Sequence, residues 1–145
     1  MDTIRVGFIG FGNWTQKAYV PALREHNNVE LVAVAARSKE THSIARAMLG
    51  ESFKSYTDYK KLLADPNIDA VMIGTPPNLS STVTLSAIKA SKHTFVEPPL
   101  DDSNTTKNLF KLVHKSGKVF HVDTEIRYLP IIKSIRNITL NADFG

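Results

Sequence analysis

The stretch Ile4–Trp14, IRVGFIGFGNW, decides the fold, because an apolar run passes directly into a glycine loop and then into a helical pattern. Thr3–Ile9 is rich in residues that favour strands and is bounded by Gly10. Trp14–His26 places its apolar residues on one face of a helix. A strand, a tight turn and a helix in this order predict the first half of a βαβ unit.

The same alternation continues along the chain and predicts a parallel sheet. Further strands are predicted at residues 30–36, 53–56, 69–74, 93–96 and 118–123. Helices are predicted at 39–49, from 58 to about 64, at 79–90, at 103–116, and briefly after 130. The strands are near-continuous apolar runs, which is typical of burial on both faces. With right-handed crossovers, the prediction is an α/β, doubly wound parallel sheet in a single domain.

Composition narrows the function classes. The chain has 145 residues, 42% of them apolar, and a net charge of +4. It contains no cysteine, which excludes disulfides, thiolate metal sites and cysteine nucleophiles. We expect no metal site. We also expect a cytoplasmic protein, since no apolar run has the length of a signal peptide or membrane span. The basic residues are scattered, so we expect no nucleic-acid partner; their excess suits a small anionic ligand.

The loop GFGNWT predicts a pyrophosphate site. Gly10 permits the tight turn, and Gly12 allows the backbone to approach a diphosphate. Asn13 and Trp14 open the helix, whose free N–H groups and positive dipole end favour an anion. Thr15 departs from the motif, which expects glycine or alanine at this position for close helix–strand packing. The alternative is a strand-to-helix turn with two convenient glycines.

The loop after the second strand discriminates between coenzymes. An acid there would bind the ribose 2′-hydroxyl of NAD, whereas an arginine accommodates the 2′-phosphate of NADP. Here Ala36 stands where an acid could be, followed by Arg37, Ser38 and Lys39. We therefore predict that Arg37 and Ser38 bind the 2′-phosphate and that the cofactor is NADP, with NAD as the alternative. A solvated basic turn at a helix start is the competing interpretation.

At this point several spaced motifs resemble the glucose–fructose oxidoreductase / inositol dehydrogenase / MocA family, between Ile4 and about Pro130. They are IRVGFIGFGNW, VELVAVAARS, YTDYKKLLADPNIDAVMIGTPPNLSS, ASKHTFVEPPL and GKVFHVDTEIRYLP. The resemblance implies a Rossmann-type dinucleotide-binding domain at residues 1–128. It also implies that residues 129–145 form a crossover towards a C-terminal substrate domain outside these 145 residues. Family members transfer hydride between a nicotinamide coenzyme and sugars, cyclitols or related diols.

The resemblance also assigns the nicotinamide side of the site and exposes a departure. Thr75 and Pro76 match the loop of the family on that side, and Glu97 would flank the nicotinamide ribose with them. The family's usual tripeptide is Glu-Lys-Pro, whose lysine assists proton transfer, but here Pro98 occupies the lysine position. Proline has neither a side-chain donor nor an N–H. The catalytic residues are therefore unknown, and we expect no turnover from this chain alone.

Other polar candidates follow the last strand and leave the function open between classes. We expect His121 to be a satisfied strand residue, and Glu125 and Arg127 to pair or anchor the crossover. The first hypothesis is the NADP-binding domain of a sugar or polyol oxidoreductase. The second is a non-catalytic, NADP-responsive regulatory module, with self-association through a sheet edge left open. The third is a flavodoxin-like domain that binds another nucleotide.

Overall fold

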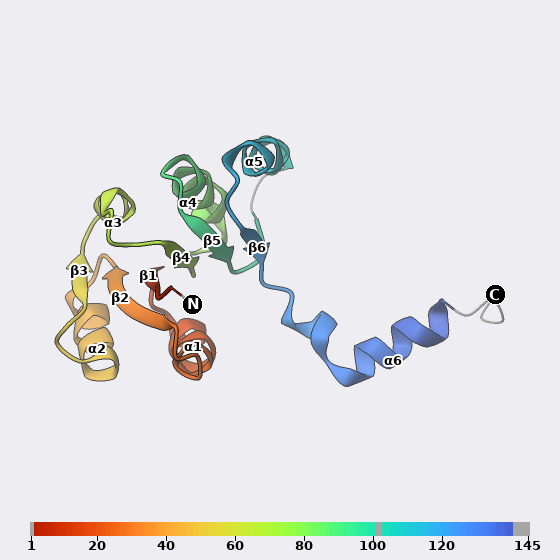
Figure 1. Ribbon diagram of the computed structural model, residues 1–145, viewed down its shortest axis with the longest axis horizontal. Helices are drawn as coiled ribbons and strands as arrows, with labels where there is room; N and C mark the ends of the chain where they lie inside the picture. Colours follow the sequence, from red (N-terminus) through yellow and green to blue (C-terminus); the bar gives the residue numbers. More distant parts are fainter. Residues whose placement is uncertain (1, 101–102, 141–145) are drawn as a thin grey trace.

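A six-stranded parallel sheet in the order β3-β2-β1-β4-β5-β6 forms the centre of the molecule (Figure 1). The computed structural model describes residues 2–100 and 103–140, without the side chains of residues 103–105. The strands are β1 Ile4–Ile9, β2 Val29–Ala35, β3 Lys54–Tyr56, β4 Ala70–Ile73, β5 His93–Val96 and β6 Phe120–Val122. The helices are η1 Thr15–Tyr19, α1 Val20–Arg24, α2 Lys39–Leu49, α3 Tyr59–Ala64, α4 Pro77–Lys89, α5 Ser103–Ser116, η2 Glu125–Tyr128 and α6 Pro130–Thr139. The predicted fold class, a doubly wound α/β sheet, is confirmed.

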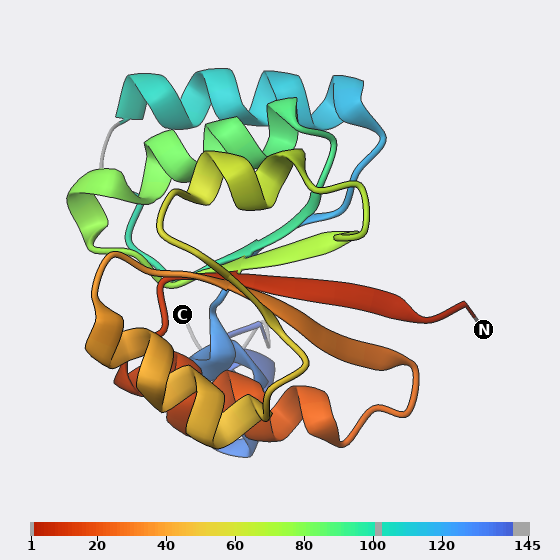
Figure 2. The ribbon, with the colours of Figure 1, turned by 90° about the vertical axis from the view of Figure 1, so that its left-hand side faces the viewer.

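Helices cover both faces of the sheet, as Figure 2 shows: α3, α4 and α5 lie on one face, and α1 and α2 on the other. The first core cluster joins the sheet to α3 and α4 and includes Leu62, Ile73 and Val83. The second joins it to η1, α1 and α2 and includes Phe8 and Val20. Phe8, Leu62 and Ile73 are completely buried, and each such side chain contributes about 1.5–3 kcal/mol to folding.

The strand order reverses between β1 and β4, and this reversal positions the site. From the central strand β1 the chain moves outward through β2 to β3, and then returns to β4 on the other side of β1. Gly10 N donates to Ala35 O, and Gly74 N donates to Ile9 O, both at 2.9 Å. The loops after β1 and β4 therefore leave the same edge side by side and then diverge. Ligands of doubly wound folds bind in the crevice at such a switch point.

The first helix is less regular than the periodicity predicts. Helical turns begin at Asn13, but the segment Thr15–Tyr19 is a π-helix, in which Val20 N donates to Thr15 O. Pro21, in the first turn of α1, has no N–H to donate to an earlier carbonyl, so the α-helical ladder is already interrupted here. Tyr19, the last residue of this π-helical segment, is buried, with 7% of its surface exposed. The helix then ends at Arg24, two residues before the predicted end at His26.

The remaining boundaries follow the sequence closely. Helix α4 begins at Pro77 rather than Leu79, because proline suits the first helical turn. Gly50 and Gly117 follow α2 and α5 with φ of +87° and +64°, as expected of residues that end helices. The strand predicted at 118–123 is shorter, and the 3₁₀ helix η2 after it was not predicted.

The predicted short helix after Pro130 is present as α6 and extends away from the sheet (Figure 1). Its apolar residues Ile131, Ile135 and Ile138 are about half exposed. Residues 141–145, the last part of the predicted crossover segment, lie outside the described residues. No helix in the described ranges has the length and apolar character that a membrane span requires.

Candidate coenzyme site

A cavity of about 580 Å³ lies at the carboxyl edge of the sheet, at the switch point between β1 and β4. It brings together predicted residues from three loops. Gly10 and Gly12 come from the loop after β1, Arg37 and Ser38 from the loop after β2, and Thr75 and Pro76 from the loop after β4. Other lining residues were not singled out from the sequence: Phe11, Thr41, Thr57, Asp58, Tyr59, Leu79, Thr82 and Val83.

The two glycines of the first loop have different physical roles. Gly10 adopts φ of +85°, and a Cβ there would lie 2.3 Å from Gly74 O, so no side chain fits. Gly12, in contrast, has open space where a Cβ would project. Gly10 therefore maintains the junction of β1 and β4. Gly12 leaves its backbone accessible to the cavity, next to the helical turns that begin at Asn13.

Thr15, the departure from the glycine motif, is accommodated by a second glycine. Its side chain is 3% exposed, and Thr15 Oγ1 would lie 2.9 Å from a Cβ at Gly74. Close approach between the first helix and the sheet is thus retained, because the residue without a Cβ is Gly74, directly after β4, rather than a residue of the helix. The threonine is compatible with a dinucleotide-binding turn.

The basic loop after β2 forms one wall of the cavity. Ser38 caps α2, with its hydroxyl accepting from Thr41 N at 3.1 Å. Arg37 is exposed, lines the cavity and forms no ion pair with any residue that the structure describes. Asp58 contributes a carboxylate to the same wall, but its Oδ1 accepts from Lys60 N as the cap of α3. Among the residues that line the cavity, Arg37 is therefore the cationic side chain available to an anion.

The loop after β4 places an unsatisfied hydroxyl in the cavity wall. Thr75 Oγ1 is buried and has no hydrogen-bond partner within residues 2–100 and 103–140. Buried polar atoms are normally paired, so this hydroxyl is suited to a ligand group. Pro76 precedes the first turn of α4 and is exposed. Ser80 Oγ is also buried without a described partner.

Glu97 lies at the end of β5, beside the loop after β4. Its N–H donates to Ile73 O at 2.9 Å, one residue before Gly74. Its carboxyl group contacts the Tyr19 hydroxyl, which also lies 2.7 Å from Asp123 Oδ2. Burial raises the pKa of Glu97, and the negative charges of Asp123 and Glu125 raise it further.

Three predicted residues are not part of the cavity wall: Asn13, Trp14 and Glu97. Asn13 and Trp14 are exposed at the start of the first helix. The Trp14 ring packs edge-on against Tyr19, with centroids 6.5 Å apart. Pro98 lines a second cavity of about 490 Å³, together with Glu97, Asp123 and η2.

The other polar candidates have structural environments. His121 stacks on Phe95, with ring centroids 5.1 Å apart. Of the two expected roles of Glu125 and Arg127, the pairing is wrong, since the ion pairs among the described residues do not include it, and anchoring of the crossover stays a prediction. Both residues lie in η2, and this tight helical turn was not anticipated.

Tyr19 lies outside the cavity wall but contacts Glu97, and the sequence does not predict this contact. A tyrosine on the apolar face of a helix predicts a core residue, and no pattern signals the π-helical turn that directs its hydroxyl towards two carboxyl groups. Asp123 is the last residue of the strand predicted at 118–123, and no motif in the sequence connects it with Tyr19. The contact between Asp123 and the Tyr19 hydroxyl depends on β5 and β6 being neighbours in the sheet, which the sequence does not specify.

Residues 4–124 match the family described as "Oxidoreductase family, NAD-binding Rossmann fold" (GFO_IDH_MocA). An uncharacterized oxidoreductase of Rhizobium meliloti, ORF334, is 30% identical over 100% of this chain and 43% of its own length. The chain therefore spans less than half of that relative.

Two of the solved structures that resemble the chain are described here by their similarity to it. Biliverdin reductase from Synechocystis, in complex with biliverdin and NADP⁺, has a TM-score of 0.83 at 27% identity, over 92% of this chain and 42% of its own. Myo-inositol 2-dehydrogenase from Lactobacillus plantarum has a TM-score of 0.86 at 27% identity, over 99% of this chain and 43% of its own. These findings identify an NAD(P)-binding Rossmann domain of the oxidoreductase type.

Proposed function

The chain belongs to the glucose–fructose oxidoreductase / inositol dehydrogenase / MocA family, and we propose that it binds NADP(H) in preference to NAD(H). The parent activity is hydride transfer between the nicotinamide and a hydroxyl or carbonyl group of a sugar or cyclitol. The observation that carries this proposal is a single cavity bounded by Gly12 on one side and by Arg37 and Ser38 on another.

The pyrophosphate lies against the glycine loop. Gly12 has no side chain to obstruct the approach, and Asn13 and Trp14 present N–H groups at the start of the helix. Unpaired N–H groups and the positive end of the helix dipole attract a diphosphate. This arrangement does not distinguish NAD from NADP, because both coenzymes contain the same pyrophosphate.

The preference for NADP comes from the loop after β2. Arg37 has no described ion-pair partner, and Ala36 provides no carboxylate to bind a ribose diol. A hydrogen bond to a charged group contributes about 1.5–3 kcal/mol, which corresponds to roughly 10- to 100-fold in affinity. The bound NADP⁺ in the Synechocystis biliverdin reductase supports this assignment.

The nicotinamide lies towards Thr75, Pro76 and Glu97. The buried Thr75 hydroxyl, which has no described partner, can bond a polar group of the ribose or carboxamide. When bound, the coenzyme would supply or accept the hydride, and Thr75, Pro76 and Glu97 would flank its nicotinamide ribose. Pro98 supplies no proton donor at the position of the family lysine. We expect this chain alone to produce no NADPH with a panel of sugars and polyols.

Separate calorimetric titrations with NADPH and NADH test the coenzyme assignment. NADPH should bind about 10- to 100-fold more tightly, and Arg37→Ala should remove most of this preference. Arg136→Ala is the matched control, because it deletes an exposed arginine of α6 outside the cavity. Equal affinities for the two coenzymes in the unaltered protein would overturn the assignment.

The second candidate function, an NADP-responsive module without catalysis, is favoured by Pro98 at the lysine position. Positioned acid–base groups contribute about 10²–10⁴ to rate. If Pro98→Lys, made in a longer chain that also contains a C-terminal substrate domain, produces measurable NADPH from the same panel of sugars and polyols, the chain is an enzyme scaffold that lacks one group. If the variant binds NADPH but remains inactive, the module is the better description.

A further inference from the structure

His42, in the first turn of α2, is a polar residue that does not line the coenzyme cavity. Its ring nitrogen Nε2 lies 2.8 Å from Ala36 O, at the carboxyl end of β2. A carbonyl oxygen can only accept a hydrogen bond, so Nε2 carries the proton and donates it. The residue after Ala36 is Arg37, which lines the cavity. The His42 ring is therefore bonded to the residue that directly precedes the proposed ligand of the 2′-phosphate.

The Ala36 carbonyl lies where the pairing of the sheet ends. The last residues paired between β2 and β3 are Ala35 and Tyr56. Ala36 N still donates to Tyr56 O at 3.0 Å, but the Ala36 carbonyl lies one step beyond this pairing. The His42 ring supplies the donor there. The bond thus extends the ordered part of β2 up to the residue before Arg37.

His42 also contacts the residue on the other side of Arg37. His42 N donates to Ser38 O at 3.3 Å, and the Ser38 hydroxyl accepts from Thr41 N at 3.1 Å as the cap of α2. The ring and the backbone of His42 therefore hold the two neighbours of Arg37. The Arg37 side chain forms no ion pair with a described residue. Its position consequently depends on the backbone on either side of it.

The other ring nitrogen of His42 indicates that the Ala36 bond orients the ring. Nδ1 is buried and has no hydrogen-bond partner within the ranges that the structure describes. A buried polar atom without a partner lowers stability, and an aliphatic side chain of similar size would avoid this cost. Replacing the ring with leucine should therefore change stability little. This expectation separates a positioning role from a merely structural one.

We propose that His42 is a positioning residue for coenzyme selection, whose ring fixes the Ala36–Arg37 segment so that Arg37 faces the 2′-phosphate of NADP(H). The inference rests on the proposed function, because it requires Arg37 to bind that phosphate. His42 acts through Arg37, since it does not itself line the cavity. Without the ring, only a fraction of the molecules holds Arg37 in the binding position, and the apparent affinity falls in proportion to that fraction.

The effect should be confined to the coenzyme that carries the extra phosphate. NADH has the same pyrophosphate and nicotinamide as NADPH but presents no 2′-phosphate to Arg37. A displaced Arg37 should therefore weaken the binding of NADPH and leave the affinity for NADH nearly unchanged. One ordinary hydrogen bond corresponds to about two- to tenfold in an equilibrium constant. We expect a loss of that size in the ratio of the two affinities.

Calorimetric titrations of two His42 variants with NADPH and NADH test the role of the ring. His42→Leu keeps most of the bulk but removes the donor, so the preference for NADPH should fall about two- to tenfold. His42→Gln places an amide nitrogen the same number of bonds from Cα as Nε2, so it should restore much of the preference. His114→Leu, which replaces an exposed histidine of α5 outside the cavity, is the matched control and should retain the full preference.

NMR of the ring nitrogens tests the bond itself, in the unaltered protein without coenzyme. The His42 signals are identified by their absence in His42→Gln. In the neutral ring the proton should reside on Nε2, because Ala36 O accepts from this atom. A proton on Nδ1 would overturn the proposal. The measurement does not depend on whether His42→Leu folds.

The outcomes distinguish the inference from the proposed function. A preference for NADPH that persists in His42→Leu overturns the positioning role and leaves the proposed function intact. Equal losses in His42→Leu and His42→Gln, or equal weakening of NADPH and NADH, also overturn it, because the donor on Nε2 would then not be the cause. Equal affinities for the two coenzymes in the unaltered protein overturn the proposed function and the positioning role together.

Discussion

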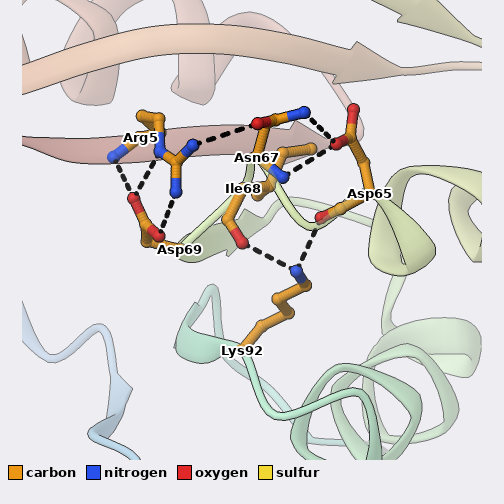
Figure 3. A network of polar contacts seen from close by, with 6 residues as sticks. All are labelled: Arg5, Asp65, Asn67, Ile68, Asp69 and Lys92. Carbon is orange, nitrogen blue, oxygen red and sulfur yellow. Dashed lines mark hydrogen bonds and ion pairs between the residues drawn. The ribbon is translucent and has the colours of Figure 1, made fainter.

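At the amino edge of the sheet, charged side chains are paired with one another or with backbone carbonyls, whereas at the carboxyl edge several polar groups have no partner in the described ranges. Figure 3 shows the amino edge: Arg5 forms a two-pronged contact with Asp69, and Lys92 Nζ donates to Asp65 O and Ile68 O, both at 2.7 Å. At the other edge, Thr75 Oγ1 is unsatisfied and Arg37 forms no ion pair with a described residue.

This difference indicates how stability and binding are divided between the edges. Pairing at the amino edge stabilises the starts of β1, β4 and β5, where the chain enters the sheet. Unsatisfied groups at the carboxyl edge lower stability but remain available to a ligand. Substitutions at the amino edge should therefore change the free energy of unfolding, and most at the carboxyl edge should change coenzyme affinity.

Gly10→Ala should break this rule and have the largest effect, because Gly10 supports the sheet although it lines the cavity. Its φ of +85° disfavours a side chain, and the new Cβ would lie 2.3 Å from Gly74 O. Strain and overpacking together should lower the free energy of unfolding by about 3–5 kcal/mol. Urea denaturation followed by circular dichroism measures it. A loss below about 1 kcal/mol would contradict the structural role of this glycine.

Lys92→Met should have the largest effect at the amino edge. The substitution keeps most of the apolar stem but removes the ammonium group that bonds Asp65 O and Ile68 O, and Lys92 is only 7% exposed. Two buried carbonyls would lose a charged donor, so we expect a loss of about 2–3 kcal/mol in the free energy of unfolding. Lys89→Met, an exposed change in α4, is the control. Equal stability of the two variants would mean that water replaces the ammonium group.

The ion pair between Arg5 and Asp69 should appear in acid denaturation. Hydrogen bonds from Arg5 lower the pKa of Asp69 to about 2. A lowered carboxyl pKa contributes stability above its unfolded value of about 3.9, and that stability is lost as pH falls towards 2. Because Asp69 is about one-third exposed, solvent screening reduces the contribution to about 1–2 kcal/mol.

The variant Asp69→Asn isolates this contribution. Between pH 5 and 2, its free energy of unfolding should depend on pH less steeply than that of the unaltered protein. Asp58→Asn removes a different capping carboxylate, in a loop at the carboxyl edge, and should retain the slope due to Asp69. Identical pH profiles for Asp69→Asn and the unaltered protein would rule out this pair as a source of acid sensitivity.

The residues of the carboxyl edge can be predicted from the sequence better than the contacts of the amino edge. Buried parallel strands read as apolar runs, so the sheet, and hence the residues of the cavity, follow from Ile4–Ile9 and its later counterparts. Gly10, Gly12 and Arg37 are recognised because each lies in a loop that directly follows a predicted strand. The roles of Lys92 and Tyr19 depend on side-chain directions across distant strands and on one π-helical turn. The hydrophobic periodicity of the sequence predicts neither of these features.

Gly12→Ala should have the smallest effect on stability and gives the sharpest comparison with Gly10→Ala. No atom lies within 4 Å of a Cβ at Gly12, so the free energy of unfolding should change by less than about 0.5 kcal/mol. The methyl group would nevertheless occupy the space through which a pyrophosphate approaches the backbone. NADPH affinity should fall at least about tenfold, equivalent to roughly 1.4 kcal/mol, in a calorimetric titration. Unchanged affinity in this stable variant would mean that the diphosphate does not contact the glycine loop, even though the loop has the geometry to receive it.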